Sequence, residues 1–325
     1  MNRLRGLLLV LAGCHSSPTE VGPAVDAPPP AATRSCTFGV TRYLVDGALT
    51  ISKVASDGTN LYAAITTRTA GSEVQMIGGA VIANGDFVDI AGADGTVFYA
   101  VRSGSSFELH AFVPPATDTK LADVPAVGPS IAIDASATTV YVRGSSDTMT
   151  TTVWSIPRAG GTLATVASYT PAGTLGAMRA NDDYVTWDET GAQGTHAIIV
   201  TLSSMPATIG PDGNDVGALH HTVWNDDVYG ARLEQQTSHY SGYEIYQLTP
   251  AFRSVSMSQV ANDTFRSQTF FGDGELLFQS TGSSGDAGIG WSGGDCNFDP
   301  AALYHGDANH VLAVDAGAVY AIQTH

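Results

Sequence analysis

Residues 54–65 read VASDGTNLYAAI, and residues 90–101 read IAGADGTVFYAV. Each stretch joins a short apolar run to an Asp-containing turn and a second run centred on an aromatic residue. Five more copies follow: IAIDASATTVYV from Ile131, MRANDDYVTW from Met178, HTVWNDDVYGA from His221, FFGDGELLFQ from Phe270 and VLAVDAGAVYAI from Val311. Asp-Gly and Asn-Asp pairs suit tight hairpin turns, and Val, Ile, Tyr and Phe favour strands. Each copy is therefore predicted to be a β-hairpin.

The repeat has the spacing of a propeller blade. The predicted turn residues are Asp57, Asp94, Asp134, Asp182, Asp226, Asp273 and Asp315, which lie 37 to 48 positions apart. Two more strand-like runs follow most hairpins, divided by a Pro or Gly turn, as in FELHAFVPPATDTKLADV from Phe107. Four strands in about 40 to 45 residues are typical of a blade. We therefore predict an all-β fold, a seven-bladed β-propeller over residues 34–325, with six blades as the alternative.

The last hairpin is not followed by two further runs, so its blade needs strands from elsewhere. Residues 36–45, CTFGVTRYLV, have strand character and precede the first copy. We expect them to close the ring, with Thr41 to Val45 as its outermost strand, because an unpaired sheet edge invites aggregation. If this strand is not part of the ring, the last hairpin is a tail and six blades is the better description.

The beginning of the chain, MNRLRGLLLVLAGC, has the basic and apolar regions of a signal peptide, and its apolar run is too short to span a membrane. Residues 11–14, LAGC, resemble the lipobox of bacterial lipoproteins. The resemblance implies removal of residues 1–13 and acylation of Cys14, with His15 favouring the outer membrane. The alternative is an ordinary signal in which Cys14 is incidental. Residues 14–33 are rich in proline and predict a spacer.

The repeat itself also resembles a known group. An Asp turn, a Val-Tyr strand and an apolar-Pro-x-x-Gly-Gly turn, as in residues 156–161, are similar to the repeats of NHL-like and TolB-like propellers of secreted bacterial lipoproteins. This family is functionally mixed, so the resemblance implies a fold and not an activity.

Three cysteines are present. With Cys14 acylated, Cys36 and Cys296 remain as a pair in an oxidising compartment, where disulfides persist. We expect a disulfide across the seam of the ring, and the alternative is two unrelated thiols.

The net charge of −17 argues against nucleic acid as a partner, because phosphates need a basic surface. It also argues against adsorption to anionic lipid, so the acyl chains of Cys14 must attach the protein to the membrane. We expect an exported, lipid-anchored monomer.

The sequence offers no motif for catalysis. It contains no His-Glu-x-x-His, Gly-x-Ser-x-Gly or Cys-x-x-Cys, and we predict no cofactor and no metal site. Residues 212–217 begin like a calcium loop but lack its later ligands, which favours a solvated acidic turn.

Topology indicates a binding face more firmly than motifs do. In a four-strand meander, the loops between second and third strands share a face with the connections between blades. We expect Asp212, Asp215, Asp263 and Asp307 on this face, together with a long loop at 232–244 that carries His239, Tyr240 and Tyr243. Aromatic rings near acceptors suit a sugar, a peptide or a cation, although a soluble acidic protein has acidic loops in any case.

Three functions remain open. The first is a non-catalytic binding or scaffolding lipoprotein with a protein or glycan ligand. The second is a metal-dependent hydrolase or lyase, which would retain a stoichiometric ion. The third is an envelope assembly factor, which would have a protein partner.

Overall fold

Turns rich in Gly, Asp and Asn divide the chain into short strands, and among the residues that the computed structural model describes, strands are the only regular secondary structure. These are residues 40–45, 48–67, 71–192, 194–203, 208–211, 220–224, 227–236, 240–249, 253–261, 267–272, 276–281, 287–292, 310–315 and 318–324. All of them belong to one compact unit, Ser35–His325. Within these ranges there is no helix of the length and apolarity that a membrane span requires.

The first four sheets are four-stranded antiparallel meanders, which we call blades I to IV. Blade I contains β2 (Ala48–Ser56), β3 (Leu61–Thr67), β4 (Gly71–Met76) and β5 (Val81–Gly85). Blade II contains β6 (Phe87–Ala93), β7 (Thr96–Ser103), β8 (Ser106–Val113) and β9 (Thr117–Val124). Blade III contains β10 (Val127–Ala135), β11 (Thr139–Ser145), β12 (Thr151–Pro157) and β13 (Ala164–Tyr169). Blade IV contains β14 (Thr174–Ala180), β15 (Tyr184–Gly191), β16 (Gly194–Thr201) and β17 (Thr208–Pro211).

Three further sheets follow. One has β18 (His220–Trp224), β19 (Asp227–Gln236), β20 (Tyr240–Gln247) and β21 (Arg253–Ala261). The next has β22 (Ser267–Gly272), β23 (Leu276–Thr281) and β24 (Ala287–Ser292). The last joins β25 (His310–Asp315) and β26 (Ala318–Thr324) to β1 (Val40–Val45).

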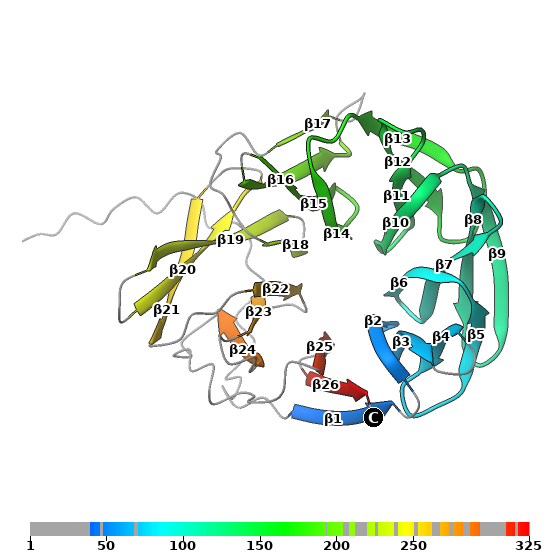
Figure 1. The fold of residues 1–325 in the computed structure, drawn as a ribbon, viewed down its shortest axis with the longest axis horizontal. Coiled ribbons are helices and arrows are strands. Elements are labelled where there is room, and N and C mark those ends of the chain that lie inside the picture. The colour runs from blue at the N-terminus through cyan, green and yellow to red at the C-terminus, as the bar shows by residue number, and fades with distance from the viewer. Residues whose placement is uncertain are drawn as a thin grey trace, which may run out of the picture. The chain divides into compact units, whose positions relative to one another are not determined.

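The sheets are arranged as in a propeller, with the first strand of each nearest the centre (Figure 1). Neighbouring first strands contact one another in the order β2, β6, β10, β14, β18, β22 and β25, and β25 contacts β2. The chain therefore folds as an all-β propeller. Side chains as well as backbone are described in blades I to IV, and mostly the backbone in the other three sheets.

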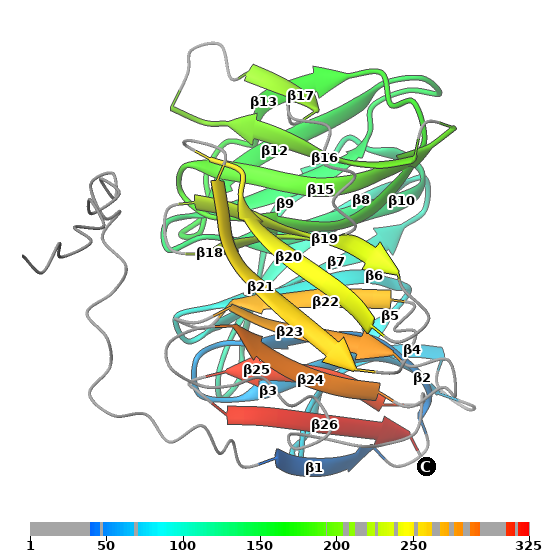
Figure 2. The same cartoon turned by 90° about the vertical axis from the view of Figure 1, so that its left-hand side faces the viewer.

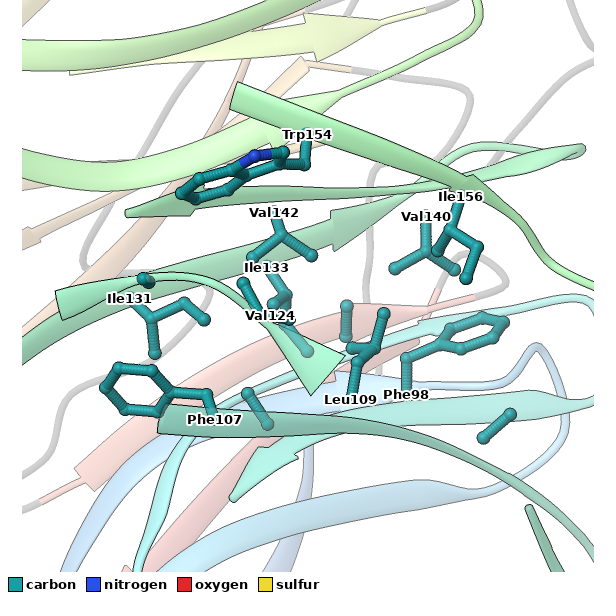
Figure 3. Packing of buried hydrophobic residues seen from close by; sticks show 14 residues of the cluster. Phe98, Phe107, Leu109, Val124, Ile131, Ile133, Val140, Val142, Trp154 and Ile156 are labelled. Carbon is teal, nitrogen blue, oxygen red and sulfur yellow. The ribbon is translucent and has the colours of Figure 1, made fainter. Parts of the chain in front are cut away.

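Apolar side chains fill the spaces between neighbouring blades, because alternate residues of each strand point toward opposite neighbours. Between blades II and III, the buried cluster includes Phe98, Phe107, Leu109, Ile133 and Trp154 (Figure 3). The aromatic side chains come from second and third strands, which lie farther from the centre, where the blades are farther apart. This packing fixes the angle between one blade and the next.

The predicted hairpins are present in blades I to IV. In blade II, Asp94 and Gly95 both have positive φ, 37° and 77°. This confirms the two-residue turn that the Asp-Gly pair predicts. The prediction for Asp134 is wrong, because Asp134 lies within β10 and pairs with Tyr141. Ser136 occupies the turn instead, and its hydroxyl accepts the amide of Thr139 at 3.1 Å.

Candidate functional site

The innermost strands carry charged side chains that link one blade to the next. The Nζ atom of Lys53 in blade I lies 2.9 Å from Oδ1 of Asp89 in blade II and donates to the carbonyl of Ile133 in blade III at 3.1 Å. The Asp89 carboxylate also accepts the amide of Ile133 at 2.8 Å and that of Ile90 at 2.9 Å. One ion pair therefore joins three consecutive blades near the centre.

A second carboxylate continues this pattern. Oδ2 of Asp134 in blade III accepts the amide of Ala180 in blade IV at 2.8 Å. Burial raises the pKa of Asp134, and the positive charges of Arg179 and Lys53 offset part of that increase. Asp134 and Asp89 thus both accept a backbone amide of the following blade.

A bulge precedes each of the two innermost side chains that form the ion pair. The register of β2 against β3 shifts between Ile51 and Lys53, and that of β6 against β7 shifts between Phe87 and Asp89. A bulge inserts one residue and changes the direction in which the next side chain points. Lys53 and Asp89 consequently point toward the following blade. Sequence periodicity cannot reveal this, because the inserted residue breaks the alternation.

One end of the ring, which we call the turn face, carries the turns between first and second strands. These turns contact one another from blade to blade: the amide of Gly95 donates to the carbonyl of Asp57 at 2.5 Å, and the Ser136 hydroxyl donates to Asp182 at 2.5 Å. The Asp57 carboxylate accepts the amides of Thr59 and Asn60, so each turn is ordered from within as well.

Arg158 strengthens the turn face between blades II and III. Its guanidinium donates to Oδ2 of Asp94 at 2.9 Å and to the carbonyls of Ala93 and Ala137 at 2.7 and 2.8 Å. It also lies over the Phe98 ring, with Cζ 5.6 Å from the centroid. The predicted Pro-x-x-Gly-Gly turn therefore positions an arginine that clamps two blades together.

The opposite end, which we call the loop face, is where the sequence predicted binding. It carries the turns between second and third strands and the connections between blades. Beside the connection from β13 to β14, Oε1 of Glu189 accepts the amide of Ala172, and Oε2 accepts the Tyr169 hydroxyl at 2.9 Å. The indole of Trp187 donates to the Tyr169 oxygen at 3.1 Å. These bonds hold the connection against blade IV.

Arg143 lies next to this group, between blades III and IV. It is 5% exposed, donates from Nη2 to the carbonyl of Gly176 at 2.8 Å, and lies over the Trp187 ring with Cζ 5.2 Å from the centroid. Nη1 has no hydrogen-bond partner among the residues that the structure describes. Burial lowers the pKa of Arg143 to about 10, against the attraction of Tyr169, Asp89 and Asp188. The sequence did not single out this arginine.

Among the residues that the structure describes, the most exposed large apolar side chain on the loop face follows an ordered turn. Met149 is 69% exposed and follows Asp147, whose Oδ1 accepts the amides of Met149 and Thr150, each at 2.7 Å. These hydrogen bonds lower the pKa of Asp147. The turn thus holds the Met149 backbone in place at the face predicted to bind ligands.

One histidine on the outer strands of blade II is surrounded by charged and aromatic side chains. His110 stacks on Tyr99, with ring centroids 5.0 Å apart, and its two ring nitrogens each lie 3.3 Å from a carboxylate, Glu108 or Asp118. Lys120 pairs with the same Glu108 at 3.1 Å. Because the two nitrogens face different carboxylates, these groups do not converge on one point. Across the described ranges, no group of three or more His, Cys, Asp or Glu side chains could hold a metal ion.

Most of the predicted site residues lie outside the described residues. These are Cys14, Cys36, Cys296, Asp212, Asp215, His239, Asp263 and Asp307. Tyr240 and Tyr243 are described in backbone only, and they correct one prediction. They belong to β20, where Tyr240 pairs with Ala261 and Tyr243 with Ser258, so most of the loop expected at 232–244 is a strand hairpin.

Comparison with known proteins supports the fold and no activity. No protein-family model matches the sequence, and no curated protein matches it. Among solved structures, the β-propeller domain of the Trilobed protease from Pyrococcus furiosus is similar over 82% of this chain and 86% of its own, with 9% identity and a TM-score of 0.53. The SapL1 lectin in complex with alpha methyl fucoside is similar over 79% of this chain and 99% of its own, with 11% identity and a TM-score of 0.51. At such identities the likeness shows the fold alone.

A putative TolB from Agrobacterium tumefaciens also matches, over 48% of this chain and 61% of its own, with 11% identity and a TM-score of 0.37. So low a score carries no argument about the resemblance to TolB-like repeats.

Proposed function

We propose that this chain is an exported lipoprotein whose β-propeller is a non-catalytic binding or scaffolding module of the cell envelope. The lipobox-like LAGC at residues 11–14 supports acylation at Cys14, and His15 supports the outer membrane. The proline-rich residues 14–33 then separate the anchor from the propeller.

The hydrogen bonds and the ion pair of the innermost carboxylates support a non-catalytic role. Asp89 accepts two backbone amides and pairs with Lys53, and Asp134 accepts the amide of Ala180. Carboxylates near the centre of the ring are the groups that a metal or an acid–base reaction would need. In blades I to IV these two already hold neighbouring blades together.

The propeller is proposed to have seven blades, closed by the N-terminal strand. The parallel pairing of β1 with β26, in which Val40 lies opposite Val319, supports this closure. A disulfide between Cys36 and Cys296 is proposed to staple the same seam. Mass spectrometry of unreduced peptides should find the two cysteines linked, and two free thiols would contradict the staple.

The loop face is the proposed site for a protein or glycan ligand. Asp212, Asp215, Asp263 and Asp307 remain candidates there, with His239, Tyr240 and Tyr243. The rigid turn at Asp147 supports this assignment, because an ordered surface loses less conformational entropy when a ligand binds.

The anchor is tested by Cys14→Ser. Without a thiol at position 14 no acyl chain can be attached, so the variant should move from the membrane to the soluble fraction after cell fractionation. A matched Cys36→Ser variant should stay at the membrane. Retention of Cys14→Ser at the membrane would contradict the lipoprotein proposal.

The non-catalytic role is tested by elemental analysis of the purified protein. We expect less than one metal ion per chain after dialysis against buffer without chelator. A stoichiometric ion would instead favour a metal-dependent hydrolase or lyase. Chemical crosslinking in intact cells tests the scaffolding role directly. An assembly role requires a protein partner that can be recovered in the crosslinked complex.

A further inference from the structure

The direction of β1 shows at which end of the ring the N-terminal segment enters the propeller. Only two residues separate Val45, the end of β1, from Ala48, the start of β2. Such a link spans about 10 Å at most, so Val45 lies close to Ala48. The strand β2 runs from Ala48 to Ser56, where the turn at Asp57 belongs to the turn face. Ala48, and Val45 with it, are therefore at the loop face.

The pairing of β1 with β26 gives the same direction. The strands run parallel, with Val40 opposite Val319 and Val45 opposite Thr324 (Figure 2). Val319 is the second residue of β26 and lies at the end of that strand where β25, the first strand of the sheet, connects to it. In blades I to IV, connections of this kind form the turn face. Val40 consequently lies at the turn face, and the chain enters there.

We propose that the turn face is the surface that faces the lipid bilayer and that the loop face points away from it. This rests on the lipid anchor proposed above. The anchor at Cys14 is covalently connected to Val40 through 25 residues, so the membrane attachment leads to the turn face and not to the loop face. A chain of this length spans about 90 Å at most, which limits how far the turn face can move from the membrane.

This orientation results from the covalent tether and not from binding of the turn face to lipid headgroups. The chain carries a net charge of −17, and Asp94 on the turn face is 73% exposed at its side chain even though it pairs with Arg158. An acidic surface is not attracted to anionic headgroups. The turn face is therefore held near lipid without binding to it, and the Met149 side of the ring is left open to the compartment.

Two exposed turn positions allow a matched test. Thr59 on the turn face and Met149 on the loop face each donate their amide to the aspartate two residues earlier, at 2.8 and 2.7 Å. A fluorophore coupled to an azide-bearing amino acid at either position leaves this backbone bond intact. The full-length acylated protein is placed on vesicles of phosphatidylcholine that contain a lipid with a nitroxide headgroup, and quenching is measured for each probe.

The probe at Thr59 should be quenched about twofold or more above the probe at Met149, since the tether keeps its face nearer the lipid. Equal quenching, or stronger quenching at Met149, would overturn the orientation. Flotation of the vesicles is measured first. Protein that does not float with vesicles would show that the anchor is wrong, which is a different result from floating protein without asymmetry.

Shortening the tether sharpens the comparison. Deletion of residues 16–33 leaves seven residues between Cys14 and Val40, with a reach of about 28 Å at most. The excess quenching at Thr59 should then rise above that of the full chain. A reversal in favour of Met149 in this variant would place the chain's entry at the loop face and overturn the proposal.

Discussion

Two aspartates of the same propeller respond in opposite ways to their surroundings. Burial tends to raise the pKa of Asp57, but hydrogen bonds from Asn60, Tyr62 and Thr59 together lower it below the ordinary value. At Asp134, burial outweighs the nearby positive charges, and the pKa is raised. Ionised Asp57 therefore stabilises the folded state, whereas ionised Asp134 destabilises it.

This contrast predicts opposite pH dependences for two matched variants. A lowered pKa gives stability that is present above the unfolded value, near pH 4, and is lost as the pH falls through the folded value. Asp57→Asn should cost about 1 to 2 kcal/mol at pH 7 and less at lower pH. A raised pKa lowers stability as the pH rises above about 4, so Asp134→Asn should be neutral or stabilising at pH 7.

Urea unfolding at pH 7 and pH 3.5 measures both effects. The Asn side chain at position 134 can still accept the amide of Ala180, so the comparison isolates the charge. A loss of stability in Asp134→Asn that is larger at pH 7 than at pH 3.5 would contradict the assignment.

Arg143 gives a second test at the scale of one residue. Its guanidinium is buried with one nitrogen unpartnered, and a buried charge of this kind is costly. Arg143→Met keeps the length of the side chain without the charge and should change the free energy of unfolding by less than about 1 kcal/mol. Arg143→Ala leaves a cavity beside Trp187 and should cost about 2 kcal/mol or more. Equal losses in the two variants would show that the charge itself is stabilising.

At the scale of one element, Arg158 occupies a position in blade III where two other blades have an apolar residue. In blade I and blade IV the residues at the same position after the third strand are Ile77 and Leu202, which pack into apolar clusters. Their amides donate to the carbonyls of Leu61 and Asp183, at or one residue before the second strand, as the Arg158 amide donates to the carbonyl of Thr138 at 3.0 Å. Blade III therefore uses hydrogen bonds and an ion pair where two other blades use burial.

We expect Arg158→Ala to lower the free energy of unfolding by about 1 to 2 kcal/mol, because the partly buried carbonyl of Ala93 loses its donor, whereas the exposed acceptors of Asp94 and Ala137 can bond to water instead. Arg158→Leu should recover part of this loss by packing on Phe98 as Ile77 and Leu202 pack in their own blades. Thermal unfolding followed by circular dichroism distinguishes them. An alanine variant as stable as the parent would mean that the clamp contributes nothing to blade packing.

The elements also show where prediction from sequence succeeds and where it fails. The Asp94-Gly95 turn was predictable because its positive φ angles restrict the residue types that fit. Aspartate is common in turns, so the local pattern predicts a turn at Asp134, but its carboxylate accepts the amide of Ala180, 46 positions away. The Gln, Ser and Gly residues of β19 and β20 predict a loop, although Leu233 and Tyr243 pair there within a strand hairpin. A partner as distant as Ala180 cannot be found in a local pattern.

At the scale of the molecule, the role of β1 can be tested by two deletions. Removing residues 16–45 takes away the strand that pairs with β26, and the edge of β26 would be left without its partner. Removing residues 16–33 takes away only the predicted spacer. The long deletion should melt far below the parent or aggregate, and the short one should melt with the parent. Scanning calorimetry measures both, and equal melting temperatures would favour six blades with a tail.

The pairing of β1 with β26 also has a consequence for how the protein folds. Val40 and Val319 are 279 positions apart, so their contact closes a very long loop and gains nothing until the blades between them are in place. Each blade is a local meander that can form early, whereas this seam depends on all of them. We therefore expect the sheet of β25, β26 and β1 to form last, as the slow step of folding. Until then the chain has unpaired strand edges. A factor that assists folding during export would act in the period before the seam closes.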